Sequence, residues 1–397
     1  MLHSPPKGAI VPHHLVRVKR PGRALALALS VLLALSACSS SGSKSPSSNS
    51  GSPSASSDSA GSASLSALEA KVAQLEKVPT HIAQTTPLKS KPTPGKEVIF
   101  MSCNIECPIE GNAVKAAAAV VGWKFRQIIY NIEDPSTMVS GLKQALQYHP
   151  SVVIAGAIPY VTWQSVIPAY KAAGVPLVTF AAGAPVKFPV VTAIADFPQY
   201  RQYGADLADW FIADSKGKGH AFITGSTDAA ALAAAVDGFQ AEVKAKCPGC
   251  TTEYDNLSLQ DINSGAAIPA VVSAVQRDPS IDYAITPNGS FFTGLASQLA
   301  SVGLSKKVKI AGIYGTSADL ANLKAGTEAA WLNYSVTQIG WASMDAALRY
   351  SEGMAMDPDE SDVPIQLLVP GGDFKVANST DVPTNYAAQY EALWKAS

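Results

Sequence analysis

The sequence has few histidines and no excess of charge of one sign, and both shortages limit what the protein can do. Its 397 residues include six histidines, and 30 basic residues stand against 31 acidic ones. No basic stripe is visible after the N-terminal segment, so we expect no nucleic-acid partner. The composition therefore argues against a DNA- or RNA-binding function.

Familiar catalytic motifs are also missing. The sequence has no Gly-x-Ser-x-Gly elbow, no His-Glu-x-x-His pair and no phosphate-binding loop. His149 and His220 precede expected strands, at the edge opposite to the one that carries ligands, so neither is placed to act as a general base. The remaining histidines are His3, His13, His14 and His81. We therefore predict that the protein is not an enzyme and needs no cofactor or metal, with a cleft hydrolase using Glu106 and Glu110 as a lesser alternative.

An apolar run near the N-terminus is too short to cross a bilayer. Four basic residues between Arg17 and Arg23 precede the apolar stretch 24–35, which is the layout of a secretory signal peptide. The stretch ends in Leu35-Ser36-Ala37-Cys38, which resembles the lipobox of bacterial lipoproteins. This resemblance implies a signal peptide over 1–37 and a diacylated Cys38 that anchors the protein to the outer face of the cytoplasmic membrane. The alternative is an ordinary signal peptide followed by an incidental cysteine.

The next two segments lead into the body of the protein. Residues 38–64 are rich in Ser and Gly and cannot bury enough apolar surface to offset their chain entropy, so we expect a flexible tether. From Leu65 to Leu75, leucine and valine recur at helical spacing and predict a short helix packed on the body. The polar stretch 76–96 is expected to be extended.

The four other cysteines form two close pairs, Cys103 with Cys107 and Cys247 with Cys250. In an oxidising compartment we expect both pairs to be disulfides. The Cys247-Pro248-Gly249-Cys250 motif has a redox interpretation, but that function needs the first cysteine at a helix N-terminus, and this pair follows an expected helix. A zinc site would need further ligands, and no second pair lies nearby.

The body, from about Glu97 to Ser397, alternates apolar strands with Ala- and Leu-rich helices, and the rhythm restarts midway. The expected strands are 98–101, 123–130, 151–155, 175–180, 220–224, 252–258, 281–286 and 308–312. The expected helices are 111–121, 136–148, 163–173, 200–214, 229–246, 268–276 and 292–302. This pattern predicts an α/β protein with two doubly wound parallel-sheet lobes. Ligands of such sheets bind beyond the carboxyl ends of the strands, and two facing lobes form a cleft.

Several short pieces, in this order and spacing, resemble the type I periplasmic binding proteins of the ribose-binding group. The resemblance covers about Glu97 to Val369. Its pieces are Val98-Ile99-Phe100-Met101-Ser102 with Pro108, Ala172-Ala173-Gly174-Val175-Pro176-Leu177-Val178, Asp237-Gly238-Phe239, Asn288, Gly312-Ile313-Tyr314-Gly315 with Asp319, and Gln338-Ile339-Gly340.

The resemblance implies a Venus-flytrap receptor that delivers a small molecule to the permease and ATPase of a carbohydrate-type ABC importer. It implies a three-crossing hinge near Asp196, Tyr334 and Gln366, cleft closure on the ligand, and a monomer. The N-terminal lobe would comprise 97–196 with 335–366, and the C-terminal lobe 197–334 with 367–397. A sensory receptor for a membrane kinase or chemoreceptor is the alternative, because the same body could present its closed form to either partner.

The chain departs from the sugar-binding pattern of that group in two places. Phe180-Ala181-Ala182 stands where an Asp usually ends the fourth strand, and the stretch 229–236 lacks the usual Arg. Charged bidentate hydrogen bonds are what fix a polyhydroxylated ring, so their loss indicates a smaller or less polar ligand.

The expected ligand contacts lie in loops that follow strands. They are Asn104, Glu106, Ile109, Glu110, Tyr160, Trp163, Phe180, Asp196, Asp228, Asn288, Phe291, Tyr314, Asn333 and Tyr334. Tyr314 and Asn288 follow a strand directly, where side chains project into the crevice. Trp163 and Phe180 have an alternative interpretation as core residues, and the two glutamates as solvated loop residues. A Cys103–Cys107 bridge would preorganise the first of these loops.

Overall fold

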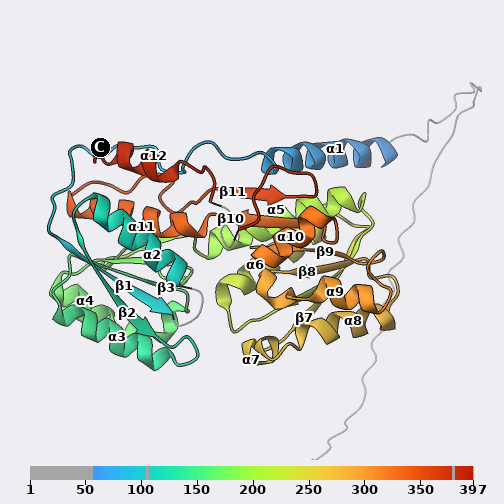
Figure 1. Cartoon of the computed structure of the whole chain (residues 1–397), viewed down its shortest axis with the longest axis horizontal. Helices are drawn as coiled ribbons and strands as arrows, with labels where there is room; N and C mark the ends of the chain where they lie inside the picture. The colour runs from blue at the N-terminus through green and yellow to red at the C-terminus, as the bar shows by residue number, and fades with distance from the viewer. Residues whose placement is uncertain (1–56, 104–106, 378–380, 397) are drawn as a thin grey trace, which may run out of the picture. The chain divides into compact units, whose positions relative to one another are not determined.

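The computed structural model of the chain describes residues 57–103, 107–377 and 381–396, with side chains from residue 65 onward (Figure 1). The expected signal peptide, residues 38–56 of the expected tether with Cys38, and the loop residues Asn104 and Glu106 lie outside this part. The prediction of a tether is wrong for residues 57–64, which form the first part of the helix Ser57–Leu75.

The first sheet has five parallel strands in the order β2-β1-β3-β4-β5. The strands are β1 Glu97–Cys103, β2 Lys124–Tyr130, β3 Val152–Gly156, β4 Leu177–Phe180 and β5 Val190–Ile194. Helices α2 (Pro108–Val120) and α11 (Val336–Ser351) lie on one face, and α3 (Pro135–Gln147) and α4 (Ile167–Ala173) on the other (Figure 1). Because both faces are covered, the central strands β1 and β3 are continuous apolar runs that are almost wholly buried.

The second sheet has six strands in the order β11-β10-β9-β8-β6-β7. They are β6 His220–Gly225, β7 Thr251–Asn256, β8 Tyr283–Thr286, β9 Lys309–Ile313, β10 Ala330–Tyr334 and β11 Ile365–Leu368. Its helices are α5 Phe197–Asp214, α6 Ala230–Lys246, α7 Leu259–Asn263, α8 Ala267–Arg277, α9 Leu295–Ser301 and α10 Ser317–Ala325. All neighbouring strands are parallel except β11, which runs antiparallel to β10.

The two-lobed parallel α/β fold predicted from the sequence is confirmed, and two expected helices begin later than predicted. The helix expected from residue 163 is preceded by two 3-10 turns, Tyr160–Thr162 and Gln164–Val166, and α4 begins where Pro168 can occupy its first turn. The helix expected from residue 292 is preceded by a 3-10 turn over Gly289–Phe292, and Gly294 in the left-handed region separates the two.

The chain passes between the sheets at the three expected crossings. It leaves β5 for α5 beside Asp196, returns from β10 to α11 after Tyr334, and enters β11 just before Gln366. Two terminal helices add further contacts: α1 (Ser57–Leu75) lies along α5, and α12 (Tyr386–Leu393) lies along α11 (Figure 1). The sequence predicts that residues 367–397 belong to the C-terminal lobe. This prediction is wrong for α12, which packs on α11 of the first lobe.

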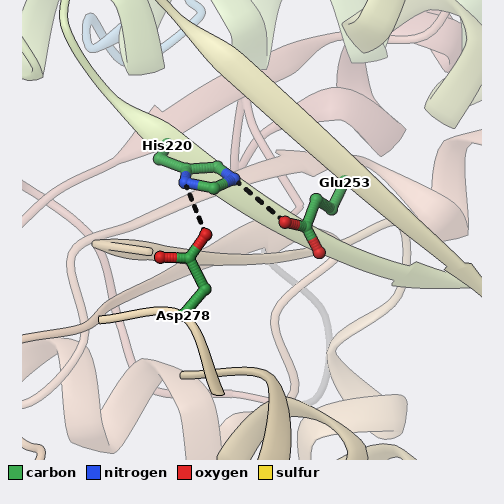
Figure 2. A group of neighbouring side chains, drawn as sticks. All are labelled: His220, Glu253 and Asp278. Carbon is green, nitrogen blue, oxygen red and sulfur yellow. Dashed lines mark ion pairs between the residues drawn. The ribbon is translucent and has the colours of Figure 1, made fainter. Parts of the chain in front are cut away.

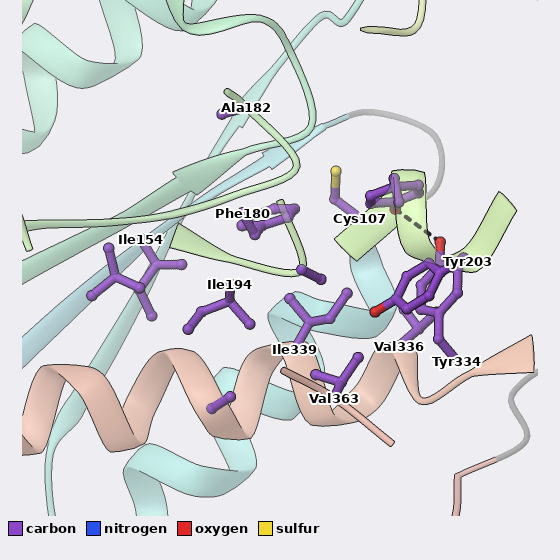
Figure 3. Packing of buried hydrophobic residues seen from close by; sticks show 14 of the residues in the cluster. Cys107, Ile154, Phe180, Ala182, Ile194, Tyr203, Tyr334, Val336, Ile339 and Val363 are labelled. Carbon is purple, nitrogen blue, oxygen red and sulfur yellow. Dashed lines mark hydrogen bonds between the residues drawn. The ribbon is translucent and has the colours of Figure 1, made fainter. Parts of the chain in front are cut away.

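The core of the first lobe fills the space between the strands and α11. Phe180 at the end of β4 stacks on Phe100 of β1, with ring centroids 5.8 Å apart, and only 2% of Phe180 is exposed. Ile194 lies between these strands and Ile339 of α11 (Figure 3). The sequence left open whether Phe180 is a ligand contact or a core residue, and in the structure it is part of the core.

Candidate functional site

The carboxyl ends of four strands carry backbone strain. Ala157, Ala181, Ala195 and Tyr314 directly follow β3, β4, β5 and β9, and each has a positive φ, between 41° and 68°. A residue with a Cβ pays roughly 1–2 kcal/mol for this left-handed conformation, and such residues cluster at functional sites. The strain thus marks the strand-end edge where ligands of parallel sheets bind.

Asp196 holds the turn after β4. Its Oδ1 accepts hydrogen bonds from the backbone N–H groups of Ala182 (2.9 Å) and Gly183 (2.7 Å). It also caps α5, and its own N–H donates to the Gln199 side chain at 3.2 Å. Because this carboxylate is buried and bonded to backbone amides, Asp196 fastens the strand-end turn to the first crossing.

Asn333 holds the turn after β9 in the same way. Its Oδ1 accepts from the N–H of Gly315 at 2.9 Å, and its Nδ2 donates to the Gly315 carbonyl at 3.4 Å. A Cβ on Gly315 would lie 2.6 Å from the Trp331 ring, so the turn needs glycine there. Asn333 is buried, and its position fixes the left-handed Tyr314 beside it.

Four tyrosines gather where the crossings meet this edge. The Tyr334 ring lies 5.2 Å from Tyr203, 5.4 Å from Tyr314 and 5.7 Å from Tyr200. Figure 3 shows Tyr203 and Tyr334 with Cys107 of the first lobe nearby. Burial raises the pKa of Tyr203 and of Tyr334 well above the usual range, so both stay neutral. Tyr200, Tyr203 and Tyr334 are buried, and the hydroxyls of Tyr200 and Tyr334 bond to each other, so Tyr314 is the member of this cluster that is partly exposed.

Two other expected contacts adjoin this cluster. The N–H of Gly289, next to Asn288, donates to the carbonyl of Tyr314 at 3.1 Å. The Asn288 side chain accepts from the N–H and the hydroxyl of Ser290, at 3.0 and 2.9 Å. Glu110 of α2 lies close enough that its charge contributes to the raised pKa of Tyr334. Asn288, Tyr314, Asn333, Tyr334 and Glu110 are thus brought together.

The remaining predicted residues lie elsewhere. Tyr160 packs edge-on against Trp163 at 5.0 Å, and its N–H donates to the Ala182 carbonyl, which places both beside the turn after β4. Trp163 is fully buried and half-buried Ile109 packs on the same core, whereas Phe291 is buried in the core of the second lobe. Asp228 is exposed and accepts from the N–H of Leu259 at 3.1 Å.

Tyr200 and Tyr203 are not predicted as site residues from the sequence. Both lie near the start of α5, where three-residue spacing on a helix indicates a buried face and nothing more specific. Their position just after the first crossing was the available signal.

Comparison with known proteins decides the family. Residues 109–355 match the sequence model of the periplasmic binding protein domain. This chain is a periplasmic binding protein. The match covers most of both sheets, including the turns after β8 and β9 that carry Asn288 and Tyr314. A search of curated proteins finds no significant match.

Solved structures share the fold of this binding protein at low sequence identity. An ABC sugar transporter subunit from Rhodobacter sphaeroides is 16% identical, with a TM-score of 0.60, 70% of this chain covered and 99% of the other. A glucose-galactose binding protein from Geobacillus stearothermophilus is 20% identical (TM-score 0.58; 73% and 100% covered). A solute-binding protein from Burkholderia graminis in complex with D-arabinose is 18% identical (TM-score 0.58; 70% and 96% covered).

A cluster of titratable side chains lies at the opposite, amino-terminal edge of the second sheet of the binding protein (Figure 2). His220 Nε2 lies 3.5 Å from a Glu253 oxygen, and Nδ1 lies 3.9 Å from an Asp278 oxygen. The two carboxylates thus face different ring nitrogens, and Arg277 lies 3.9 Å from Glu253. This arrangement fits an ion-pair cluster better than a metal centre, which needs three or four ligands converging on one point.

Both predicted disulfides of the binding protein are present in the structure. Cys103–Cys107 joins the end of β1 to the start of α2, and Cys247–Cys250 lies between α6 and β7. Cys247 follows α6, so it lacks the helix N-terminus that a redox cysteine needs. Within the described part of the chain, no helix has the length and apolar character needed to cross a membrane.

Proposed function

We propose that this binding protein captures a small neutral solute between the strand-end edges of its lobes and delivers it to an ABC importer. The observation that carries the proposal is the tyrosine cluster of Tyr200, Tyr203, Tyr314 and Tyr334 beside a strained strand end. Family membership supports solute binding rather than catalysis, so we infer that the ligand is released unchanged.

The ligand that fits this edge is a sugar, a polyol or a less polar relative. Its polar side chains are largely engaged: Asp196 and Asn333 bind backbone amides, and Asn288 accepts from Ser290. What remains is the partly exposed aromatic surface of Tyr314 and Tyr160, which suits a ligand with an apolar face and a few hydroxyls. Similar folds bind D-arabinose or carry sugar-transporter names, which supports the class.

We propose direct contacts from Tyr314, Tyr160, Asn288, Asp228 and Tyr334, joined by the first loop with Asn104, Glu106, Ile109 and Glu110. We propose Asp196 and Asn333 as positioning residues, because their side chains accept hydrogen bonds from backbone amides of the strand-end turns. The Cys103–Cys107 bridge would preorganise the first loop, an effect on affinity that stays a prediction.

Capture would proceed by bending at the crossings near Asp196, Tyr334 and Gln366, so that the lobes close over the solute. The lobes proposed for this movement are 97–196 with 335–364 and α12, and 197–334 with β11. The sequence-based division places 365–366 in the first lobe and α12 in the second. The closed form would then be the one that a permease recognises, and the protein would act as a monomer.

A ligand screen tests the binding function directly. The protein is unfolded and refolded to remove co-purified solute, and its melting temperature is then measured with hexoses, pentoses, polyols, aromatic acids and purines. A ligand that binds only the native state raises this temperature. We expect a sugar or polyol to do so, and Tyr314→Ala to abolish the shift while Tyr148→Ala, an exposed tyrosine on α3's C-cap, keeps it. Equal shifts in both variants would refute the proposed site.

Anchoring is a separate part of the proposal. We propose that Cys38 is diacylated and holds the protein on the outer face of the cytoplasmic membrane. Cells expressing the wild type should incorporate labelled palmitate into the protein, and Cys38→Ala should not. Labelling that persists in Cys38→Ala would contradict the anchor at this residue.

A further inference from the structure

The segment between the expected tether and the first strand is fixed to both lobes. Its helix α1 lies along α5 of the second lobe, where Lys71 Nζ lies 2.7 Å from an Asp206 oxygen and 2.6 Å from an Asp209 oxygen. Both carboxylates are almost wholly buried. Burial opposes the charge on Lys71, but its hydrogen bonds to the two aspartates outweigh this and raise its pKa to about 12. Leu68 and Val72 are buried beside it.

The following residues are fixed to the first lobe instead. Buried Gln84 donates to the carbonyls of Asp359, Glu360 and Asp362 at 3.1–3.3 Å, and its Oε1 accepts from the Tyr390 hydroxyl of α12 at 2.6 Å. These four partners lie on the loop after α11 and on α12, and not on the second sheet.

Further along, the backbone of this segment is bound in the same region. The N–H groups of Thr85 and Thr86 donate to Asp357 at 3.1 and 2.7 Å, and Arg349 of α11 donates to the Thr86 carbonyl. Leu88 is buried, and its N–H donates to the carbonyl of Leu393 at 2.9 Å. Freeing either end would therefore leave buried polar groups without partners.

A short stretch of chain, the bridge, joins the part of the segment that is fixed to the second lobe to the part that is fixed to the first. It runs from Glu76, whose carbonyl accepts from Gln366 Nε2 at the third crossing (3.1 Å), to Thr80, whose carbonyl accepts from Gln389 of α12 (3.0 Å). Figure 1 shows this part of the chain running from α1 toward α12. Even fully extended, four residues span about 14 Å.

We propose that residues 65–96 form a strap that limits how far the two lobes can separate in the ligand-free protein. The three crossings permit bending, while the strap, fixed outside them at both ends, sets the widest opening. A limited opening keeps the binding-competent arrangement more populated, which raises the apparent affinity for a solute. The inference rests on the proposed movement of the lobes.

The test lengthens the bridge and leaves both attachments intact. A Gly/Ser linker of about 12 residues, which behaves as flexible coil, is inserted between Val78 and Pro79 of the full-length protein in detergent. Donor and acceptor dyes are attached through unnatural amino acids at exposed positions 115 on α2 and 244 on α6. Single-molecule energy transfer then reports the distance between the lobes without ligand. The matched control carries the same linker between Ser50 and Gly51.

We expect the bridge insertion to shift the distance distribution to longer values and to broaden it, with the control identical to the wild type. Identical distributions for both insertions would overturn the strap. Should the bridge insertion melt early, a protease site at the same position, cut after folding, gives the same comparison before and after cleavage. A solute that shortens the distance in the wild type, combined with no effect of the insertion, would reject the strap and leave the proposed function standing.

Discussion

The hydroxyl oxygens of Tyr200 and Tyr334 lie 2.9 Å apart, and this contact ties the start of α5 to the end of β10. Tyr200 comes just after the first crossing, and Tyr334 comes just before the second. The two chain segments on which bending depends are therefore linked by a hydrogen bond between tyrosines that burial and aromatic packing hold in place.

Replacing either tyrosine by phenylalanine keeps the ring and removes this bond. We expect Tyr334→Phe to lower the free energy of unfolding by about 1 kcal/mol, the usual net value of one buried hydrogen bond. Urea unfolding of Tyr200→Phe, Tyr334→Phe and the double variant forms a double-mutant cycle. The double variant should lose less than the sum of the single losses, and strict additivity would show that the hydroxyls do not interact.

Arg349 is the centre of a fully buried charge network on α11. Its guanidinium lies 2.5 Å from Asp345, 3.1 Å from Glu360 and 3.7 Å from Asp357. We expect Arg349→Met to cost about 3–5 kcal/mol of unfolding free energy, because it leaves buried carboxylates without their cation. Arg201→Met, which removes an exposed pair with Asp237, should cost less than about 1 kcal/mol in the same assay. Similar losses for both variants would contradict this account.

Glu328 gives the second lobe a dependence on pH. Burial, reinforced by nearby Asp319, raises the pKa of its carboxyl from 4.5 to about 7, although hydrogen bonds from Asn322 and Trp331 act against this shift. The folded protein therefore binds this proton more tightly than the unfolded chain. The contribution to stability is complete below pH 4.5 and is lost as the pH rises through about 7, a change of about 3 kcal/mol.

Unfolding free energies measured between pH 4 and pH 8 test this prediction on the wild type and on Glu328→Gln, which cannot ionise. Subtracting the two curves removes the contributions of other groups. The difference between the unfolding free energies of the two proteins should change between pH 4 and pH 8. A difference that stays constant over this range would show that burial does not shift the pKa of Glu328.

Trp394, at the end of α12, is fully buried on the first lobe. It stacks on Trp341 of α11 with centroids 5.4 Å apart, and its Nε1 donates to Asp345 at 2.6 Å. We expect Trp394→Ala to cost about 3–5 kcal/mol, as other large core truncations do. The neighbouring Lys395→Ala should change the free energy of unfolding by less than about 0.5 kcal/mol. A small loss for Trp394→Ala would mean that α12 is not part of the core.

Most of both sheets could be predicted from the sequence because strands buried on both faces are continuous apolar runs. β5 and β11 were not predicted. Each strand is short and begins directly after a proline, Pro189 for β5 and Pro364 for β11, and a proline in such a place indicates a loop. In β10, Asn333 interrupts the apolar run, so its strand pattern is weak. The antiparallel β11 could not be predicted, since strand direction depends on the path between elements.

The sequence could indicate candidate residues that closely follow a strand: Tyr314 comes directly after β9, and one residue, Pro287, separates Asn288 from β8. The roles of Asp196 and Asn333 could not be predicted, because the amides that they bind belong to turns that only the tertiary fold brings close. Phe180 and Phe291 illustrate the limit of this approach, because a place near a strand end does not decide whether a ring points outward or into the core, and both rings are buried.

The contact between Trp394 and Trp341 also has a consequence for biosynthesis. A chain is made from its N-terminus, and lobes that close early can fold as they emerge. Here the lobe that is begun first, at β1, lacks part of its core until α12 and Trp394 have been synthesised. All strands of the second sheet lie between α5 and α12 in the chain, so the second lobe must be made before the first can complete its core. A chain cut just before Trp394 would therefore contain every strand of both sheets and still have an unfinished first lobe.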